Sequence, residues 1–333
     1  MGSTIREISK RTGFSPATVS NALNHKRGVN SETAAAIFKM ADELSYEVTG
    51  KVKKVSFVIF RANGKIIDDT PFFTLMIDGV QRECKKSGLE MQLMNLDKGA
   101  EDYLQQIEKL KADTSSAIIL LGTELDDEDL VTFKNCKCPF LVLDYWVSDM
   151  SFNSVLINNA DSARCATQYL INHGHREIGY LRGDFRIKAF RSRAVGYKIA
   201  LEKAELVQNP EYEITLSTTM DGAYRDMKKY LEGGKRRMPT AFFSDNDMIA
   251  LGAMKAMEEF GIRVPEDVSI IGFDDLPFCE ISSPRLTTLR VNKQEMGQTA
   301  VRRICELIEH TDSSRLKIQI CTDFVERDSV RTI

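Results

Sequence analysis

From residue 55 onward, short apolar runs alternate with longer segments whose apolar residues recur at helical spacing. Most of the runs are predominantly apolar, which is typical of strands buried on both faces of a parallel sheet. We expect strands at residues 55–60, 91–94, 117–121 and 140–144, and again at 178–182, 213–216, 241–244 and 268–273. We expect helices near residues 73–87, 101–111, 128–135, 160–172, 191–203, 222–231 and 247–260. The pattern predicts an α/β body of two doubly wound, parallel-sheet lobes.

Such a body also indicates where a ligand would bind. In doubly wound sheets, ligands lie beyond the carboxyl ends of the strands. Two lobes that face each other bring these ends to one shared cleft. We therefore expect the ligand of the body between the lobes.

The first 46 residues show three short helical segments instead. Thr4 and Glu7 form a Thr-x-x-Glu capping box, and Gly13 ends that helix. Ser15 caps a second helix with Pro16 at its first position, and its outward residues are small or carry amides. A third helix begins after Asn30. This order is typical of a helix-turn-helix, whose second helix enters the major groove of DNA.

The distribution of charge agrees with a nucleic-acid partner for this head. The net charge of −3 divides into nine Lys and Arg against five Asp and Glu in residues 1–54, or +4, and 36 against 43 in the remainder, or −7. A basic head on an acidic body suggests that the head meets a polyanion. Ordinary scatter of surface charge is the alternative on charge alone.

Composition limits the setting in which the chain works. The longest apolar stretches, residues 117–121 and 140–143, fall far short of the roughly 18 residues that a membrane span needs. Residues 1–11 lack the apolar core of a secretory signal. The seven cysteines are an odd number without framework spacing, which favours free thiols in a reducing cytoplasm. We expect a cytoplasmic protein with no membrane partner.

The head carries a specific resemblance to a known family. Its residues read Thr4-Ile-Arg-Glu-Ile-Ser-Lys-Arg-Thr-Gly-Phe-Ser-Pro-Ala-Thr-Val-Ser-Asn-Ala-Leu-Asn24, followed by Val29-Asn-Ser-Glu-Thr33 and Glu43-Leu-Ser-Tyr46. These motifs resemble the headpiece of the lactose/galactose-repressor (LacI/GalR) family of transcriptional regulators. The resemblance implies that residues 1–48 form a DNA-binding head.

The resemblance also implies a role for individual residues of the head. Base edges would be faced by Pro16, Ala17 and Asn21, and phosphates would be held by Thr4, Ser15, Thr18, Ser20, Asn24 and Thr33. Hydroxyl and amide groups near a helix N-terminus suit phosphate oxygens, and a carboxamide can pair with adenine. The family most often has Arg at the position of Asn21, so the base read there is expected to differ.

The linker departs from the family pattern. Relatives usually continue with Arg-Pro-Asn-x-x-Ala-Arg-x-Leu, which folds into a hinge helix on DNA, whereas this chain has Tyr46-Glu-Val-Thr-Gly-Lys-Val-Lys-Lys-Val55. About a dozen linker residues and the wedge leucine are absent. Gly50 and its β-branched neighbours disfavour a helix. We expect a short linker at residues 49–54 that kinks the operator less than that of typical relatives.

The body resembles the same family and the periplasmic sugar-binding proteins. The motifs are Thr70-Pro-Phe-Phe73, Asn172-His-Gly-His-Arg-Glu-Ile-Gly179, Arg193-Ala-Val-Gly-Tyr197, Phe242-Phe-Ser-Asp-Asn-Asp-Met-Ile-Ala-Leu-Gly252, Val264-Pro-Glu-Asp-Val-Ser-Ile-Ile-Gly-Phe-Asp-Asp275 and Pro284-Arg-Leu-Thr-Thr288. The resemblance implies a first lobe at residues 55–158 and 290–321 and a second lobe at 159–289 and 322–333.

Effector contacts follow from the same resemblance. It implies them for Arg193, Asn246 and Asp274, and for Asp144 in the first lobe, a donor and acceptor set that suits a polyol. Phe72 or Phe73 would cover an apolar sugar face. Trp146 follows a strand end and is either a stacking ring in the cleft or a partly buried core residue. Many sugar binders have Gln where this chain has Val291, so one polar contact is lost.

Weaker motifs do not indicate metal or catalysis. His173-Gly-His175 lacks a third ligand, and the pair Cys136-x-Cys138 lacks a second pair. Asp274 and Asp275 lie where the family has an effector contact and a structural carboxylate. No P-loop, Gly-x-Gly-x-x-Gly or nucleophile elbow is present. We expect no metal, no cofactor and no catalytic residue.

The sequence thus predicts a ligand-responsive regulator, a repressor rather than an enzyme. It would bind a double-stranded operator as a homodimer and respond to a small molecule, expected to be a sugar, in the cleft. Two other classes stay open. A solute-binding protein would carry a signal peptide or lipid-attachment cysteine, and an α/β enzyme with a helical appendage would need a nucleophile, base or metal in the cleft.

Overall fold

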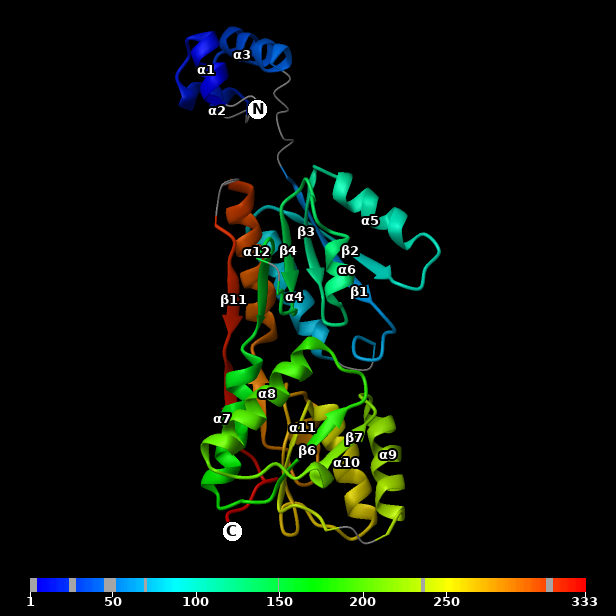
Figure 1. Cartoon of the computed structure of the whole chain (residues 1–333). Coiled ribbons are helices and arrows are strands. Elements are labelled where there is room, and N and C mark those ends of the chain that lie inside the picture. Colours follow the sequence, from blue (N-terminus) through cyan, green and yellow to red (C-terminus); the bar gives the residue numbers. More distant parts are fainter. Residues whose placement is uncertain are drawn as a thin grey trace.

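The computed structural model describes residues 5–23, 28–44, 52–68, 71–148, 150–234, 237–309 and 314–333, apart from the side chain of Asp42. The chain forms a small helical head and a body of two lobes (Figure 1). The predictions at Thr4, at Asn24, at residues 45–48 of the head and at residues 49–51 of the linker lie outside the described residues.

The head consists of three helices around one small core. They are α1 (Ile5–Thr12), α2 (Pro16–Leu23) and α3 (Ser31–Glu43). Ile8, Val19, Leu23 and Ile37 are buried between them. Gly13 makes the turn between α1 and α2 with a positive φ of 76°, a conformation that glycine adopts without steric cost. The expected helix-turn-helix is confirmed.

The first lobe is built on a six-stranded parallel sheet in the order β11-β5-β4-β3-β1-β2. Its strands are β1 (Lys54–Arg61), β2 (Glu90–Asp97), β3 (Ser116–Leu121), β4 (Phe140–Leu143), β5 (Asn153–Ile157) and β11 (Lys317–Ile320). One face packs against α4 (Phe72–Lys86) and α12 (Lys293–Glu309), the other against α5 (Tyr103–Ala112) and α6 (Asp127–Val131). Burial on both faces explains why its central strands are predominantly apolar.

The second lobe repeats the design on a four-stranded parallel sheet in the order β7-β6-β8-β9. Its strands are β6 (Ile178–Gly183), β7 (Glu213–Leu216), β8 (Ala241–Ser244) and β9 (Ser269–Ile271). Helix α7 (Asn159–Asn172) packs on α8 (Lys188–Lys203), and α9 (Met220–Glu232) on α10 (Asp247–Glu259) (Figure 1). Short elements complete the lobe, namely η1 (Pro210–Tyr212) and α11 (Phe278–Ile281).

Three short crossings connect the lobes. The chain passes from β5 to α7, from β10 (Thr288–Val291) to α12, and from β11 to β12 (Thr322–Val325), each time with a single residue between the two elements. β10 and β12 pair antiparallel. The first and third crossings lie side by side, since the Asn158 N–H donates to the Ile320 carbonyl at 2.9 Å.

The structure corrects the sequence-based element list in two respects. Four strands were not expected, namely β5, β10, β11 and β12, because each is only four or five residues long and three of them mix polar and apolar side chains. The helix expected at 128–135 is α6, which ends at Val131 and continues as turns. The α/β class with two parallel sheets is confirmed.

Candidate functional site

Most of the predicted DNA-contacting residues that the structure describes lie on α2 or directly before it, away from the core of the head. Ser15, Pro16 and Ala17 are exposed, while the buried residues Val19 and Leu23 face the core. The remaining predicted residues that the structure describes are half-buried, namely Thr18, Ser20, Asn21 and Thr33. Of the predicted residues that the structure describes, all but Thr33 on α3 therefore lie at one short helix.

The N-terminus of α2 is organised by Ser15. Its Oγ accepts from the Thr18 backbone N–H at 3.1 Å and lies 2.9 Å from Thr18 Oγ1. Two hydroxyls thus lie beside backbone N–H groups at a helix start, an arrangement that favours phosphate oxygens. Arg6, Lys10 and Arg11 are exposed on the preceding helix and add positive charge. They are candidate phosphate contacts that the sequence analysis did not single out.

In the body, six of the seven predicted effector residues line one small cavity between the lobes. They are Phe72, Phe73, Asp144, Arg193, Asn246 and Asp274. The cavity has a volume of about 20 Å³, close to the space of one water molecule. The lobes are therefore closed upon each other, and the predicted contacts face one another directly.

Strand ends bring the two carboxylates to this cavity. Asp144 follows β4 directly with a φ of 60°, and Asp274 lies three residues after β9 with a φ of 116°. Non-glycine residues adopt these angles at a cost, and they cluster at functional sites. The carboxylate of Asp144 accepts from Thr123 Oγ1 at 2.6 Å, and Thr123 itself lies just after β3.

Arg193 is the centre of the cavity wall. Its side chain is only 4% exposed. Nε donates to Asn159 Oδ1 at 2.8 Å, Nη1 to the Asp245 carbonyl at 2.5 Å, and Nη2 lies 3.3 Å from Asp274 Oδ1. The guanidinium stacks 3.5 Å from the centre of the Phe273 ring. The fork geometry of arginine is thus fixed before any ligand arrives.

Burial perturbs the acidic groups of the cavity. It raises the pKa of Asp144 to about 6, against the opposing effects of the Thr123 hydrogen bond and the Arg193 charge. Burial also raises the pKa of Asp274, although Arg193 and Lys293 oppose it. Strongly perturbed carboxyls in a cleft are a feature of functional sites.

Asn246 differs from the other predicted contacts because part of it is already used. Its Oδ1 caps α10 by accepting from the Ile249 N–H at 3.0 Å. The neighbouring aspartates, Asp245 and Asp247, are fully buried. Asp247 accepts from Thr288 Oγ1 at 2.6 Å, which ties the start of α10 to β10.

Trp146 does not line the small cavity. It lies 42% exposed at the rim of an adjacent pocket of about 330 Å³, with its ring 5.2 Å from Lys317 Nζ. Asp144, Ile157 and Ala189 line both spaces, so the pocket is a lateral extension of the cavity.

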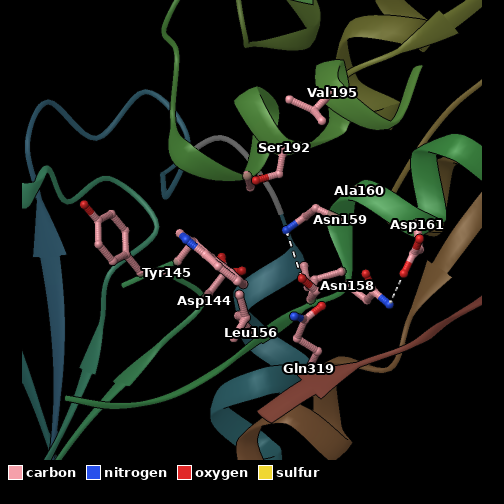
Figure 2. Close-up of a pocket in the computed structure, with 13 residues that line it drawn as sticks. Asp144, Tyr145, Leu156, Asn158, Asn159, Ala160, Asp161, Ser192, Val195 and Gln319 are labelled. Carbon is pink, nitrogen blue, oxygen red and sulfur yellow. Dashed lines mark hydrogen bonds between the residues drawn. The ribbon is translucent and has the colours of Figure 1, made fainter. Parts of the chain in front are cut away.

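Amide and hydroxyl side chains form part of the lining of the adjacent pocket (Figure 2). Asn158, Asn159 and Gln319 come from the crossing segments, and Ser192 from α8. Asn158 Nδ2 donates to Asp161 Oδ2 at 3.1 Å, and Asn159 Nδ2 donates to the Ile157 carbonyl at 3.2 Å. A ligand entering here would meet polar groups of the segments that connect the two lobes.

Sequence reasoning missed Thr123, Asn159 and Asp245 as partners in the site. Thr123 follows β3 much as Asp144 follows β4, so the rule that ligands lie beyond the carboxyl ends of parallel strands could have indicated it. Val291, the position at which many sugar binders have Gln, is buried and does not line the cavity. Among the described residues, no group of three or more His, Cys, Asp or Glu could hold a metal ion. None of the helices in that part of the chain is long and apolar enough to cross a membrane.

Comparisons with known proteins agree with this geometry. Residues 4–48 match the model of bacterial regulatory proteins of the lacI family, and residues 167–330 match that of the periplasmic binding protein-like domain. The chain is 30% identical over 332 residues to the HTH-type transcriptional repressor PurR of Pasteurella multocida, with 99% of each chain covered.

Solved structures show the same fold. A complex of the transcriptional regulator CelR with cellobiose is similar with a TM-score of 0.74 and 23% identity, over 98% of this chain and 99% of that one. The lac repressor dimer bound to operator and the anti-inducer ONPF is similar with a TM-score of 0.73 and 24% identity, over 99% and 100%.

Proposed function

The chain belongs to the lacI family of bacterial regulatory proteins and is a DNA-binding transcriptional repressor, and from this premise we propose that a sugar in the interlobe cleft controls its binding to an operator. The repressor acts as a homodimer, each head reading one half-site of a near-palindrome. It works in the cytoplasm, where it meets both DNA and effector.

One observation carries the proposal for the cleft. Asp144 from the first lobe faces Arg193 and Asp274 from the second around a single cavity. Carboxylates accept sugar hydroxyl protons and a guanidinium donates in a fork, while Phe72 and Phe73 offer apolar faces. A polyol bound to both lobes would hold them closed, so its binding energy acts on the lobe arrangement.

A ligand screen tests the effector class. Sugars and sugar phosphates form one set and purine bases a second, because the same phenyl rings would stack on a base and the similar PurR repressor is a relative. We expect saccharides to raise the melting temperature of the full chain by mass action, and Asp144→Asn to lower that shift. Stabilisation by nucleobases alone would overturn the sugar proposal and leave the repressor assignment intact.

Asn21 tests the base-reading role of α2. Asn21→Ala should weaken binding to the selected operator by about 1–3 kcal/mol while leaving random DNA nearly unaffected, because a bidentate amide contact is specific to its base. Lys10→Ala on the exposed face of α1 is the matched control. It should weaken both DNAs similarly and reduce the salt dependence by about one counterion. Equal losses on both DNAs for Asn21→Ala would reject its role.

A further inference from the structure

Two thiols lie together just before β4, in a turn that the effector proposal does not use. The Sγ atoms of Cys136 and Cys138 are 3.2 Å apart and share a hydrogen bond. A disulfide bond has an S–S length of about 2.05 Å. Closing the bond therefore requires the two sulfur atoms to approach by only about 1 Å.

The turn holds the two thiols in this position. Asn135 takes a positive φ of 62°, which reverses the chain immediately before Cys136. After Cys138, the Pro139 carbonyl accepts from the Ile118 N–H at 2.8 Å and joins the turn to β3. Cys138 is buried in the core between the sheet and α5, whereas Cys136 is half-buried and accessible from solvent.

The two thiols differ in reactivity. The hydrogen bond from Cys138 lowers the pKa of Cys136 to about 7, and the nearby Lys111 ammonium adds to the effect. The same hydrogen bond, together with burial, raises the pKa of Cys138. A thiol with a pKa near ambient pH is the better attacking group, and its buried neighbour is suited to resolve a mixed disulfide.

We propose that Cys136 and Cys138 form a thiol–disulfide exchange site that a small-molecule disulfide oxidises to an intrachain disulfide. The Cys136 thiolate attacks one sulfur of the small disulfide, whose S–S bond breaks and releases one thiolate. The Cys138 thiol then loses its proton and attacks Cys136 Sγ, which releases the second thiolate. Two electrons and two protons pass from the cysteines to the small molecule, which leaves as two thiols.

The site lies at the end of the first-lobe sheet opposite to the cleft. Cys138 is close enough to Asp113 for that carboxylate to act on its pKa, and Asp113 pairs with Lys54 at 3.1 Å. Lys54 begins β1, shortly after the chain enters the body from the head. The exchange chemistry can therefore be measured without disturbing the effector cavity.

Glutathione disulfide is a suitable probe on the reduced, full-length protein. After incubation near pH 7, remaining thiols are alkylated under denaturing conditions and the protein is digested with trypsin. Lys137 lies between the two cysteines, so cleavage there leaves two peptides joined only by the new disulfide. We expect this linked pair as the main product at Cys136, formed several-fold faster than glutathione adducts at the exposed Cys165.

Serine variants assign the steps. Cys138→Ser should trap glutathione on Cys136, because no resolving thiol remains, and Cys136→Ser should leave Cys138 reduced. Cys165→Ser, the matched control, should give the linked pair unchanged. A wild-type protein that keeps glutathione on Cys136, or in which Cys136 reacts no faster than Cys165, would overturn the proposal.

Discussion

The cleft depends on a few buried charged residues that have almost no access to water. The three guanidinium nitrogens of Arg193 donate hydrogen bonds to Asn159, Asp245 and Asp274. Within the described part of the chain, the Asp144 carboxylate accepts a hydrogen bond from Thr123, and Arg193 acts on it at longer range. A buried carboxylate with so little compensation is costly, so the proposed effector role of Asp144 opposes stability.

This opposition predicts how stability responds to pH. Since the pKa of Asp144 is raised from 3.8 to about 6, the folded protein binds this proton more tightly than the unfolded chain. The resulting stabilisation is complete below the unfolded pKa and is lost as pH rises through the folded pKa. Relative to Asp144→Asn, the wild type should lose about 2 kcal/mol of unfolding free energy between about pH 4.5 and 7.

Urea titrations of both proteins across this range measure the difference. Asp144→Asn serves as the reference for the wild type, because the other carboxyls with shifted pKa values, such as Asp247, are present in both proteins. The unfolding free energy of the wild type relative to the variant should fall as pH rises. A relative value that stays constant or increases would show that Asp144 is ionised without penalty.

Individual site residues were predictable to different degrees. Asp144 and Asp274 follow strands, a position that the apolar runs reveal, and their roles came from the family motifs. Asn159 gives no such signal, because its contact with Arg193 depends on how the first crossing enters α7. For Trp146 the sequence left two roles open, a stacking ring and a core residue, since a strand end does not determine on which side of the cavity a ring lies; the structure places it beside the adjacent pocket.

At the scale of elements, α4 and α12 pack unusually closely through paired glycines. A Cβ on Gly79 would lie 2.2 Å from the Gln294 carbonyl oxygen, and a Cβ on Gly297 would lie 2.3 Å from the Met76 carbonyl oxygen. No side chain fits there without a shift of one helix. Because α4 begins with Phe72 and α12 follows the second crossing, this contact fixes one wall of the cavity.

Gly297→Ala should therefore destabilise the protein by more than about 2 kcal/mol, although alanine favours a helix by about 1 kcal/mol. Gln298→Ala, one position further along α12, should change stability by less than about 0.5 kcal/mol. Denaturant unfolding of both variants checks this. A Gly297→Ala protein as stable as the wild type would show that the helices separate at little cost.

Elements differed in how well the sequence revealed them. The central strands β1, β3 and β4 are mostly apolar and bounded by polar residues, so their pattern stands out. Strand β11 reads Lys-Ile-Gln-Ile and is paired only at the sheet edge. Its position depends on pairing with β5, which lies more than 150 residues earlier in the sequence, and local periodicity does not encode such a contact.

At the scale of the whole molecule, ion pairs between the two lobes add to the cavity contacts that hold the lobes closed. Lys188 Nζ at the start of α8 lies 2.6 Å from Asp127 Oδ2 on α6, and Lys65 lies 3.7 Å from Asp184. The Lys188 ammonium lowers the pKa of Asp127. These pairs are partly exposed, so each stabilises closure by about 1 kcal/mol at most.

Lys188→Met should shift the ligand-free protein toward open lobes by up to about fivefold. Small-angle X-ray scattering should then show a larger radius of gyration without ligand. Lys203→Met at the other end of α8 is the matched control and should scatter like the wild type. An unchanged radius for Lys188→Met would mean that the cavity contacts alone keep the lobes together.

The 20 Å³ cavity has a kinetic consequence. It admits about one water molecule, so a larger molecule enters only during the intervals in which the lobes have parted. Binding is then gated: the observed rate rises with ligand concentration and levels off at the opening rate of the lobes. With the proposed effector site in this cavity, the repressor would respond to a sudden excess of effector no faster than its own lobes open, however abundant the effector becomes.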